Sequence, residues 1–421
     1  MEYGLIGARL GHSFSAQIHK ALAPHSEYEL CELPEEDDAR RFFAQREFCA
    51  VNVTIPYKQL ALAACDEVDE KAAAIGAVNT VVNRGGRLFG CNTDYAGFLY
   101  MARRAGAEFR GKNVLVLGTG GTSKTVHAAA ADEGAACVLH ASRTGRGGAL
   151  TYAEAAARAA QFDIIVNTTP AGMYPDEDAC AADPREYPNV RAVLDVVYNP
   201  MRTELLQRAQ EAGARVADGL PMLVAQAFYA REHFEGRALD AQRIEQVLRA
   251  LRADRANLVL VGMPSCGKSG VGKACAQALH KRFVDADAEI ERRAGRPIRE
   301  ILRPGEEDAF RDLESEVLAD LAKGSGQVIA TGGGSVLRAQ NVRRLRRGGP
   351  VIFLDRPLAL LRPGGGRPLT QTREALERQW RERRPLYEAA CHARVENAGS
   401  MEQTVSAVGK AFYEVLDREW A

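Results

Sequence analysis

Two glycine-rich loops of different type constrain the fold of this chain more than any other feature. Residues 118–123 read Gly-Thr-Gly-Gly-Thr-Ser, which is typical of dinucleotide binding, and residues 262–269 read Gly-Met-Pro-Ser-Cys-Gly-Lys-Ser, a phosphate-binding pattern. Each loop follows an apolar run and precedes a stretch that is compatible with a helix. Backbone N–H groups at the start of such a helix bind phosphate. The sequence therefore predicts two nucleotide cofactors and two reactions in one chain.

Length, charge and cysteine content narrow the class of protein. The 421 residues are too many for one compact core and fit two or three domains. Lys+Arg and Asp+Glu are equal at 55 each, so no net charge attracts nucleic acid or an anionic membrane. The nine cysteines form no C-x-x-C pair, and the sequence contains neither a signal-peptide pattern nor a membrane-length apolar run. We expect a cytoplasmic protein with small-molecule partners and leave its oligomeric state open.

The order of apolar runs predicts an α/β fold throughout. Before the first loop, strands are expected at residues 3–6, 50–54 and 78–83, and a helix at 60–74. From residue 113, strands at 113–117, 136–141, 163–167 and 192–197 alternate with helical stretches, which favours a parallel, doubly wound, Rossmann-like sheet. Residues 252–255 read as a charged connector, and a second α/β unit with a parallel sheet follows from residue 257.

The first loop and the strand after it indicate which dinucleotide is bound. NAD-specific sites usually place an acidic residue at the end of that strand to hold the ribose 2′-hydroxyl. Here the strand ends in Ser142-Arg143-Thr144, and arginine can pair with a 2′-phosphate, so NADP is favoured. The predicted cofactor-binding residues are Gly118, Gly120, Gly121, Thr122, Ser123, Ser142, Arg143 and Thr144.

Seven motifs in the first 250 residues resemble, in order, the signature blocks of shikimate dehydrogenase. They stand at residues 11–15, 52–58, 76–80, 92–94, 167–173, 195–200 and 222–226. Ala16 departs from the family, which usually has proline there. The resemblance implies that Ser13 and Ser15 hold the substrate carboxylate, and that Lys58 and Asp94 are the proton-transfer pair beside the reacting C–O bond. It further implies that the ring hydroxyls are bound by Thr54, Asn79 and Gln226.

The second loop predicts phosphoryl transfer. In G-x-x-x-x-G-K-[ST], the backbone from Gly262 to Gly267 wraps the phosphates, Lys268 neutralises the β and γ oxygens, and Ser269 ligates Mg²⁺. Such a site also needs an acceptor pocket, a positioning carboxylate and cations for the transition state. We therefore expect ATP with Mg²⁺ as the second cofactor.

Residues 257–395 resemble shikimate kinase. The motifs stand at residues 283–287, 306–311, 332–334, 367–369 and 383–387. The resemblance implies that Asp285 helps to hold Mg²⁺ through water, that Asp287 orients the reacting hydroxyl, and that Arg367 closes over ATP. It also implies that the shikimate ring and carboxylate are bound by Arg311, Gly332, Gly333, Gly334 and Arg383. Three departures bear on ATP binding: Gly270 where threonine is usual, the short stretch between Arg362 and Arg367, and Cys266 in the loop.

Together these patterns predict a bifunctional enzyme that reduces 3-dehydroshikimate to shikimate and then phosphorylates it. The expected domains are residues 1–97 with 219–251 for shikimate binding and catalysis, 98–218 for NADP, and 257–421 for the kinase. One alternative is an active dehydrogenase fused to an inactive or metabolite-sensing kinase-like domain. Another is a quinate/shikimate dehydrogenase that works oxidatively with NAD. Ser142 and Arg143 argue against this alternative, because they favour NADP.

Overall fold

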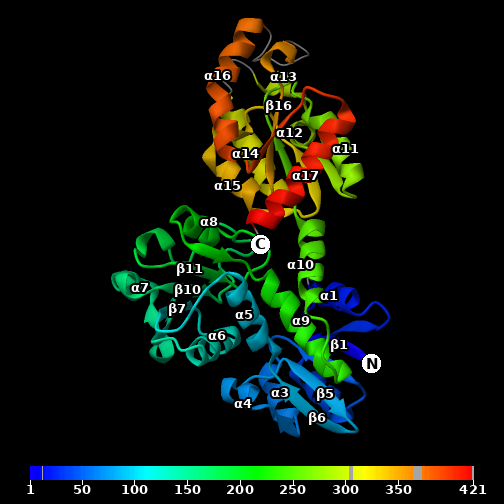
Figure 1. The fold of residues 1–421 in the computed structure, drawn as a ribbon, viewed down its shortest axis with the longest axis vertical. Coiled ribbons are helices and arrows are strands. Elements are labelled where there is room, and N and C mark those ends of the chain that lie inside the picture. The colour runs from blue at the N-terminus through cyan, green and yellow to red at the C-terminus, as the bar shows by residue number, and fades with distance from the viewer. Residues whose placement is uncertain (12, 303–306, 364–371, 420–421) are drawn as a thin grey trace. The chain divides into compact units, whose positions relative to one another are not determined.

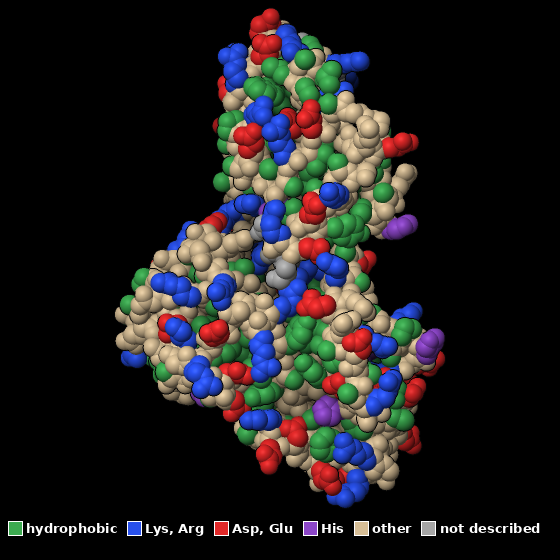
Figure 2. Space-filling model, viewed as in Figure 1, with side chains coloured by type: hydrophobic (Ala, Val, Ile, Leu, Met, Phe, Trp, Pro, Cys, Tyr) green, Lys and Arg blue, Asp and Glu red, His purple; other side chains and the backbone are tan. Residues whose placement is uncertain are grey.

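The computed structural model describes residues 1–11, 13–302, 307–363 and 372–419. The chain divides into two compact units, which are described separately below. The first consists of Met1–Asn199 and Thr203–Leu251, and the second of Pro200–Arg202 and Arg252–Ala421. Within the described residues, no helix combines the length and the apolarity needed to cross a membrane. On the face shown in Figure 2, Lys and Arg side chains are interspersed with Asp and Glu, in keeping with their equal numbers.

The first unit begins with a mixed six-stranded sheet of order β2-β1-β3-β5-β6-β4. Strand β1 pairs in parallel with β2 and β3, whereas β5 runs antiparallel to β3 and β6. Its strands are β1 (Tyr3–Gly7), β2 (Tyr28–Glu32), β3 (Ala50–Val53), β4 (Glu67–Val68), β5 (Thr80–Arg84) and β6 (Arg87–Cys91). Its helices are α1 (Ser15–Leu22), α2 (Glu36–Gln45), α3 (Lys58–Ala64) and α4 (Glu70–Ile75).

The second sheet of this unit is parallel throughout, with the order β12-β11-β10-β7-β8-β9, which confirms the predicted doubly wound sheet. Because the strands are parallel, the loops that follow β7 and β8 lie at one edge, where such folds bind ligands. The strands are β7 (Asn113–Leu117), β8 (Cys137–Ser142), β9 (Leu150–Thr151), β10 (Ile164–Asn167), β11 (Ala192–Asp195) and β12 (Arg215–Ala217). The accompanying helices are α6 (Gly121–Asp132), α7 (Tyr152–Ala157) and α8 (Glu204–Glu211).

Two helices, α5 (Thr93–Arg104) and α9 (Leu220–Glu235), pack side by side between the two sheets of the first unit (Figure 1). Gly97 allows this close approach, because a Cβ there would lie 2.7 Å from the carbonyl oxygen of Met222. The following helix, α10 (Gln242–Arg255), packs Ile244 and Leu248 into the same apolar cluster as Phe228 of α9.

The second unit is a parallel five-stranded sheet of order β14-β15-β13-β16-β17. Figure 1 shows α11 and α17 on one side of this sheet and α14 to α16 on the other. The strands are β13 (Leu258–Val261), β14 (Arg282–Asp285), β15 (Gln327–Ala330), β16 (Val351–Asp355) and β17 (Ala393–Glu396). The helices are α11 (Lys268–Ala278), α12 (Ala286–Ala294), α13 (Ile298–Ile301), α14 (Glu307–Lys323), α15 (Ala339–Arg347), α16 (Arg373–Ala390) and α17 (Met401–Glu419).

Three local predictions differ from the structure. The helix expected over residues 60–74 is interrupted by β4, and the short strands β2 and β6 were not anticipated. The charged connector at 252–255 is the last turn of α10 rather than a separate segment. For β2, β4 and β6, pairing with strands from other parts of the chain decides the local structure.

Candidate active sites

A cavity of about 810 Å³ lies in the first unit, between its two sheets. The mixed sheet contributes the ends of β1 and β3 with their following turns, and the parallel sheet contributes Thr122, Met173 and Val196. Helices α5 and α9 form the remaining wall. The structure brings to this cavity all seven residues that were predicted for substrate binding and proton transfer: Ser13, Ser15, Thr54, Lys58, Asn79, Asp94 and Gln226.

Lys58 and Asp94 form an ion pair at the cavity wall. Lys58 is the first residue of α3 and Asp94 lies in the first turn of α5, and their Nζ and Oδ2 atoms are 2.5 Å apart. Both side chains are mostly buried, at 21% and 14% exposed. The start of a helix favours a negative charge, so the position of Asp94 in the first turn of α5 suits a carboxylate. An ammonium group held in this way can give a proton to a developing alkoxide or stabilise it.

The hydroxyl and amide groups around the cavity are oriented by bonds within the fold. Ser13 Oγ donates to Ser15 Oγ at 3.1 Å and accepts from the Ser15 N–H at 3.2 Å. Asn79 Oδ1 accepts from the Thr93 N–H at 2.7 Å, which leaves the amide NH₂ of Asn79 for the cavity. Gln226 Nε2 donates to the Leu223 carbonyl at 2.9 Å, so Gln226 Oε1 is available to accept a hydrogen bond from a ligand. The set suits a ligand that bears both hydroxyl groups and a carboxylate.

The first glycine loop connects β7 to α6 and has the shape that a pyrophosphate needs. Gly118 adopts a φ of +110°, and a Cβ there would lie 2.7 Å from Thr168 Oγ1. A Cβ at Gly120 or Gly121 would meet nothing within 4 Å, so the space beside the helix start is open. Ser123 donates to the Gly120 carbonyl at 2.6 Å and fixes the turn. The loop therefore fits a dinucleotide phosphate at the N-terminus of α6.

The residues after β8 fit an additional phosphate. Ser142 Oγ accepts from the Gly145 N–H at 3.1 Å and shapes the turn that carries Arg143 and Thr144. Both of these residues are exposed, and within the described residues Arg143 makes no ion pair or hydrogen bond. No carboxylate stands among Ser142, Arg143 and Thr144 to hold a ribose hydroxyl.

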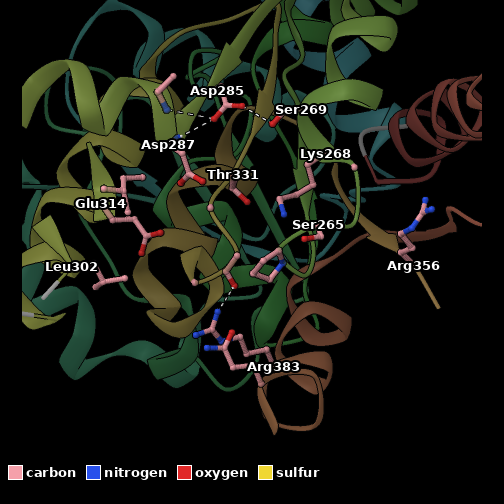
Figure 3. A pocket seen from close by; sticks show the side chains of 18 of the residues that line it. Ser265, Lys268, Ser269, Asp285, Asp287, Leu302, Glu314, Thr331, Arg356 and Arg383 are labelled. Carbon is pink, nitrogen blue, oxygen red and sulfur yellow. Dashed lines mark hydrogen bonds between the residues drawn. The ribbon is translucent and has the colours of Figure 1, made fainter. Parts of the chain in front are cut away.

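A second cavity, of about 1000 Å³, lies in the second unit at the ends of β13, β14 and β15. Figure 3 shows Lys268, Asp287 and Arg383 reaching toward it from different elements. Its walls hold every described residue predicted for this site that presents a side chain to the ligand. They are Lys268, Ser269, Asp285, Asp287, Arg311 and Arg383, joined by the backbone of Gly332, Gly333 and Gly334. Arg367 lies outside the described residues.

Hydrogen bonds and a glycine with positive φ fix the conformation of the second glycine loop. Gly262 has a φ of +150°, and a Cβ there would lie 2.6 Å from the Leu354 carbonyl oxygen. The Lys268 ammonium group donates to the carbonyls of Gly262 and Met263 at 2.8 and 3.0 Å, so it stays inside the loop. Asn397, which follows β17, donates to the Cys266 carbonyl at 2.7 Å and so connects the glycine loop to the end of β17. The loop and its lysine fit the phosphates of a nucleoside triphosphate.

Ser269 and Asp285 supply oxygen ligands of the kind that Mg²⁺ prefers. Ser269 Oγ donates to Asp285 Oδ2 at 2.6 Å, as the dashed line in Figure 3 shows. The other Asp285 oxygen caps α12 by accepting from the N–H of Asp287 at 3.1 Å. Mg²⁺ is usually held by one or two such groups together with nucleotide phosphates and water. The pair therefore fits the ion that the sequence predicts here.

Asp287 is one of the carboxylates that line the cavity, and its pKa is shifted. Burial raises its pKa to about 6 from an ordinary value of 3.8, Lys268 opposes the shift, and Asp285 and Glu314 add to it. The exposed surface of Asp287 faces the cavity, where protein atoms replace much of the surrounding water. A carboxylate with such a pKa can accept a proton near neutral pH.

Arginines on two helices line the same cavity as the glycine loop. Arg311 of α14 is buried and donates to Glu314 at 2.7 Å, and its Nε atom makes no hydrogen bond within the described part of the chain. Arg383 of α16 donates to the Gly333 carbonyl at 3.1 Å. A Cβ at Gly334 would lie 2.1 Å from Arg311 Nη1, so glycine leaves room for the guanidinium group in its present position. Two guanidinium groups held in this way suit a carboxylate ligand.

Comparison with known proteins identifies both units. Two family models match, the shikimate dehydrogenase substrate binding domain over residues 5–81 and shikimate kinase over residues 264–413. The shikimate dehydrogenase (NADP(+)) of Clostridium perfringens strain SM101 is 33% identical over 268 residues, covering 59% of this chain and 98% of the relative. Its counterpart in Geobacillus kaustophilus strain HTA426 is 35% identical over 274 residues, with the same coverage of 59% and 98%. The chain belongs to the shikimate dehydrogenase family.

Solved structures of shikimate dehydrogenases agree in fold. The enzyme of Thermus thermophilus, in complex with NADP(H) and shikimate, matches with a TM-score of 0.54 and 32% identity, covering 59% of this chain and 99% of that one. A chorismate mutase/shikimate 5-dehydrogenase fusion protein from Clostridium acetobutylicum matches with a TM-score of 0.55 and 33% identity, covering 59% and 96%. The shikimate kinase match lies in the second unit. The chain therefore joins an oxidoreductase, shikimate dehydrogenase, to a phosphotransferase, shikimate kinase.

Sequence reasoning assigned no role to several residues that the structure places at the two sites. In the kinase unit they are Glu314, Arg356 and Asn397, and in the dehydrogenase unit Arg9. The spacing of Glu314 three residues after Arg311 on one helix could have indicated their pairing. Asn397 carries no such signal, because its partner Cys266 is 131 residues away.

Proposed function

We propose that this chain reduces 3-dehydroshikimate to shikimate with NADPH and then phosphorylates the 3-hydroxyl of shikimate with MgATP. The observation that carries the proposal is the presence of two cavities in one chain. One has a Lys–Asp pair and polyol-binding groups, and the other has a phosphate loop and two buried arginines. Residues 1–97 with 219–251 would bind the first substrate, 98–218 would bind NADP, and 257–421 would act as the kinase.

In the first reaction, Lys58 holds the proton that the new hydroxyl group needs. When bound, NADPH supplies the hydride. Lys58 donates its proton to the oxygen of the former ketone, and Asp94 keeps the ammonium group in position 2.5 Å away. Ser13 and Ser15 hold the carboxylate, and Thr54, Asn79 and Gln226 fix the ring through its hydroxyl groups.

In the second reaction, Asp287 accepts or orients the proton of the attacking hydroxyl group. When bound, MgATP supplies the phosphoryl group. Lys268 neutralises phosphate charge, Ser269 and Asp285 hold Mg²⁺, and Arg311 and Arg383 hold the shikimate carboxylate. The backbone of residues 332–334 borders the ring.

NADP rather than NAD is proposed on two grounds. Arg143 is exposed in the turn after β8, where a 2′-phosphate would lie. The relatives from Clostridium perfringens and Geobacillus kaustophilus are named as NADP(+) enzymes. A cytoplasmic location is proposed because all nine cysteines are free thiols, as a reducing compartment maintains them.

One incubation tests the whole proposal. The chain is mixed with 3-dehydroshikimate, MgATP and NADPH carrying deuterium at both C4 positions, and the products are weighed by mass spectrometry. The expected product is shikimate 3-phosphate with one deuterium, because the carbon that receives the hydride also bears the phosphorylated oxygen.

The other outcomes separate the two halves. Deuterated shikimate without phosphate would leave a dehydrogenase beside an inactive kinase-like unit. Phosphorylation of added shikimate without reduction would reject the dehydrogenase assignment. Equal or faster turnover with NADH would reject the assignment of NADP.

A further inference from the structure

The charges that line the dehydrogenase cavity do not balance. Its described walls hold two cations, Arg9 and Lys58, and one carboxylate, Asp94. Lys58 is paired with Asp94 at 2.5 Å, so the charge of Lys58 is already neutralised. Arg9 remains as a single uncompensated positive charge in this part of the cavity wall.

Arg9 has no partner of its own among the described residues. It lies in the turn between β1 and α1 and takes part in no side-chain hydrogen bond or ion pair there. The nearest carboxylate along the paired strand, Glu32, accepts instead from the N–H of Leu10 at 2.7 Å. A bond from the Ser13 N–H to the Leu10 carbonyl, 2.9 Å, closes the turn. The same short turn therefore presents both Arg9 and Ser13 to the cavity.

A role in stability does not account for this arginine. Its side chain is exposed, and among the described residues it forms no ion pair or side-chain hydrogen bond that would stabilise the unit. A free guanidinium group that borders a binding cavity attracts an anion and can form two parallel hydrogen bonds to a carboxylate.

We propose that Arg9 is a substrate-binding residue that pairs with the carboxylate of 3-dehydroshikimate and of shikimate, beside Ser13 and Ser15. This inference rests on the proposed dehydrogenase function and adds a cation to a carboxylate site otherwise made of hydroxyl groups. It predicts that the unit distinguishes the acid from a neutral ester through Arg9.

The test compares Arg9→Gln and Arg9→Lys with the unaltered chain in the oxidation of shikimate by NADP⁺. Arg9→Gln is expected to raise the KM for shikimate about 2- to 5-fold, as for an exposed charge pair, with little change in kcat or in the KM for NADP⁺. Arg9→Lys should retain most of the affinity. Arg158→Gln is the matched control, because Arg158 is exposed and lines neither cavity.

The methyl ester of shikimate supplies a readout that a structural role would not change. The preference for shikimate over its ester, measured as a ratio of kcat/KM values, should fall in Arg9→Gln by the same factor as the affinity. It should stay unchanged in Arg158→Gln. An unchanged ratio in Arg9→Gln, or a rise in the KM for NADP⁺ instead, would overturn the inference. No shikimate oxidation by the unaltered chain would overturn the proposed dehydrogenase function itself.

Discussion

Single residues decide the chemistry of both sites, and Lys58 gives the clearest case. Replacing Lys58 by Met removes the ammonium group that stands 2.5 Å from Asp94. We expect the kcat for reduction to fall by about 10²- to 10⁴-fold, the usual contribution of a positioned acid. Steady-state kinetics with 3-dehydroshikimate and NADPH measure the change.

The fused kinase supplies the control for this variant. Phosphorylation of added shikimate by Lys58→Met should match that of the unaltered chain, because Lys58 and the kinase cavity belong to different units. A variant that loses both activities has misfolded, and one that keeps its reductase rate shows that Lys58 is not the proton donor.

The raised pKa of Asp287 leads us to expect that kinase activity falls on the acid side of its pH profile. Burial raises the pKa of this carboxyl group to about 6, so the residue carries a proton below that pH and cannot accept another. The kcat/KM for shikimate phosphorylation should fall about tenfold per pH unit below the pKa. In Asp287→Asn the rate should be lower and this limb absent. If the limb persists in the variant, another group is responsible for it.

Residues in the two glycine loops were predictable because spacing alone identifies them. Lys268 and Ser269 follow a glycine at fixed positions, and a phosphate loop needs them there. Arg9, Arg356 and Asn397 were not predictable in the same way. Their surroundings are made by segments that only the folded chain brings together, as when Arg356 donates to the Asn397 carbonyl at 3.2 Å.

At the scale of elements, helix α11 carries two glycines with opposite requirements. A Cβ at Gly270 would only touch Met401 Cε at 3.6 Å, whereas a Cβ at Gly272 would lie 2.7 Å from Phe283 Cε2. Gly270→Ala should therefore stabilise the kinase unit by up to about 1 kcal/mol through helix propensity. Gly272→Ala should destabilise it by about 1–3 kcal/mol through overpacking. Urea unfolding, monitored through the loss of kinase activity, measures the stability change in each variant. Equal changes in the two variants would contradict the predicted difference between Gly270 and Gly272.

Elements whose apolar pattern is strong were predicted well, and those made by distant pairing were not. The parallel strands β7, β10 and β13 are continuous apolar runs, which is why their positions were expected. The helix expected at 60–74 fails because Glu67 and Val68 pair with Phe89 and Gly90 of β6. Asp69 then caps a new helix by accepting from the Ala72 N–H at 2.8 Å. The helix and strand propensities of residues 60–74 cannot reveal that pairing, because the partner strand lies elsewhere in the sequence.

At the scale of the whole molecule, two units with separate cores should unfold in two steps. A ligand that binds only the folded state stabilises it by about 2.7 kcal/mol at 100 times its Kd. Added NADP⁺ should raise one thermal transition and MgATP the other, as calorimetry would record. In Lys268→Met the response to MgATP should disappear while the response to NADP⁺ remains. A single transition that both ligands raise would show that the units unfold together.

Because both nucleotide loops lie on one polypeptide, the two kinds of site are always made in a ratio of one to one. Every copy of the chain brings one dehydrogenase site and one kinase site, so gene expression cannot adjust the two capacities separately. Only turnover numbers and affinities would then balance supply and demand for the metabolite that the two proposed reactions share. A substitution that weakens ATP binding would then make shikimate accumulate, and making more of the chain would not change the proportion of the two sites.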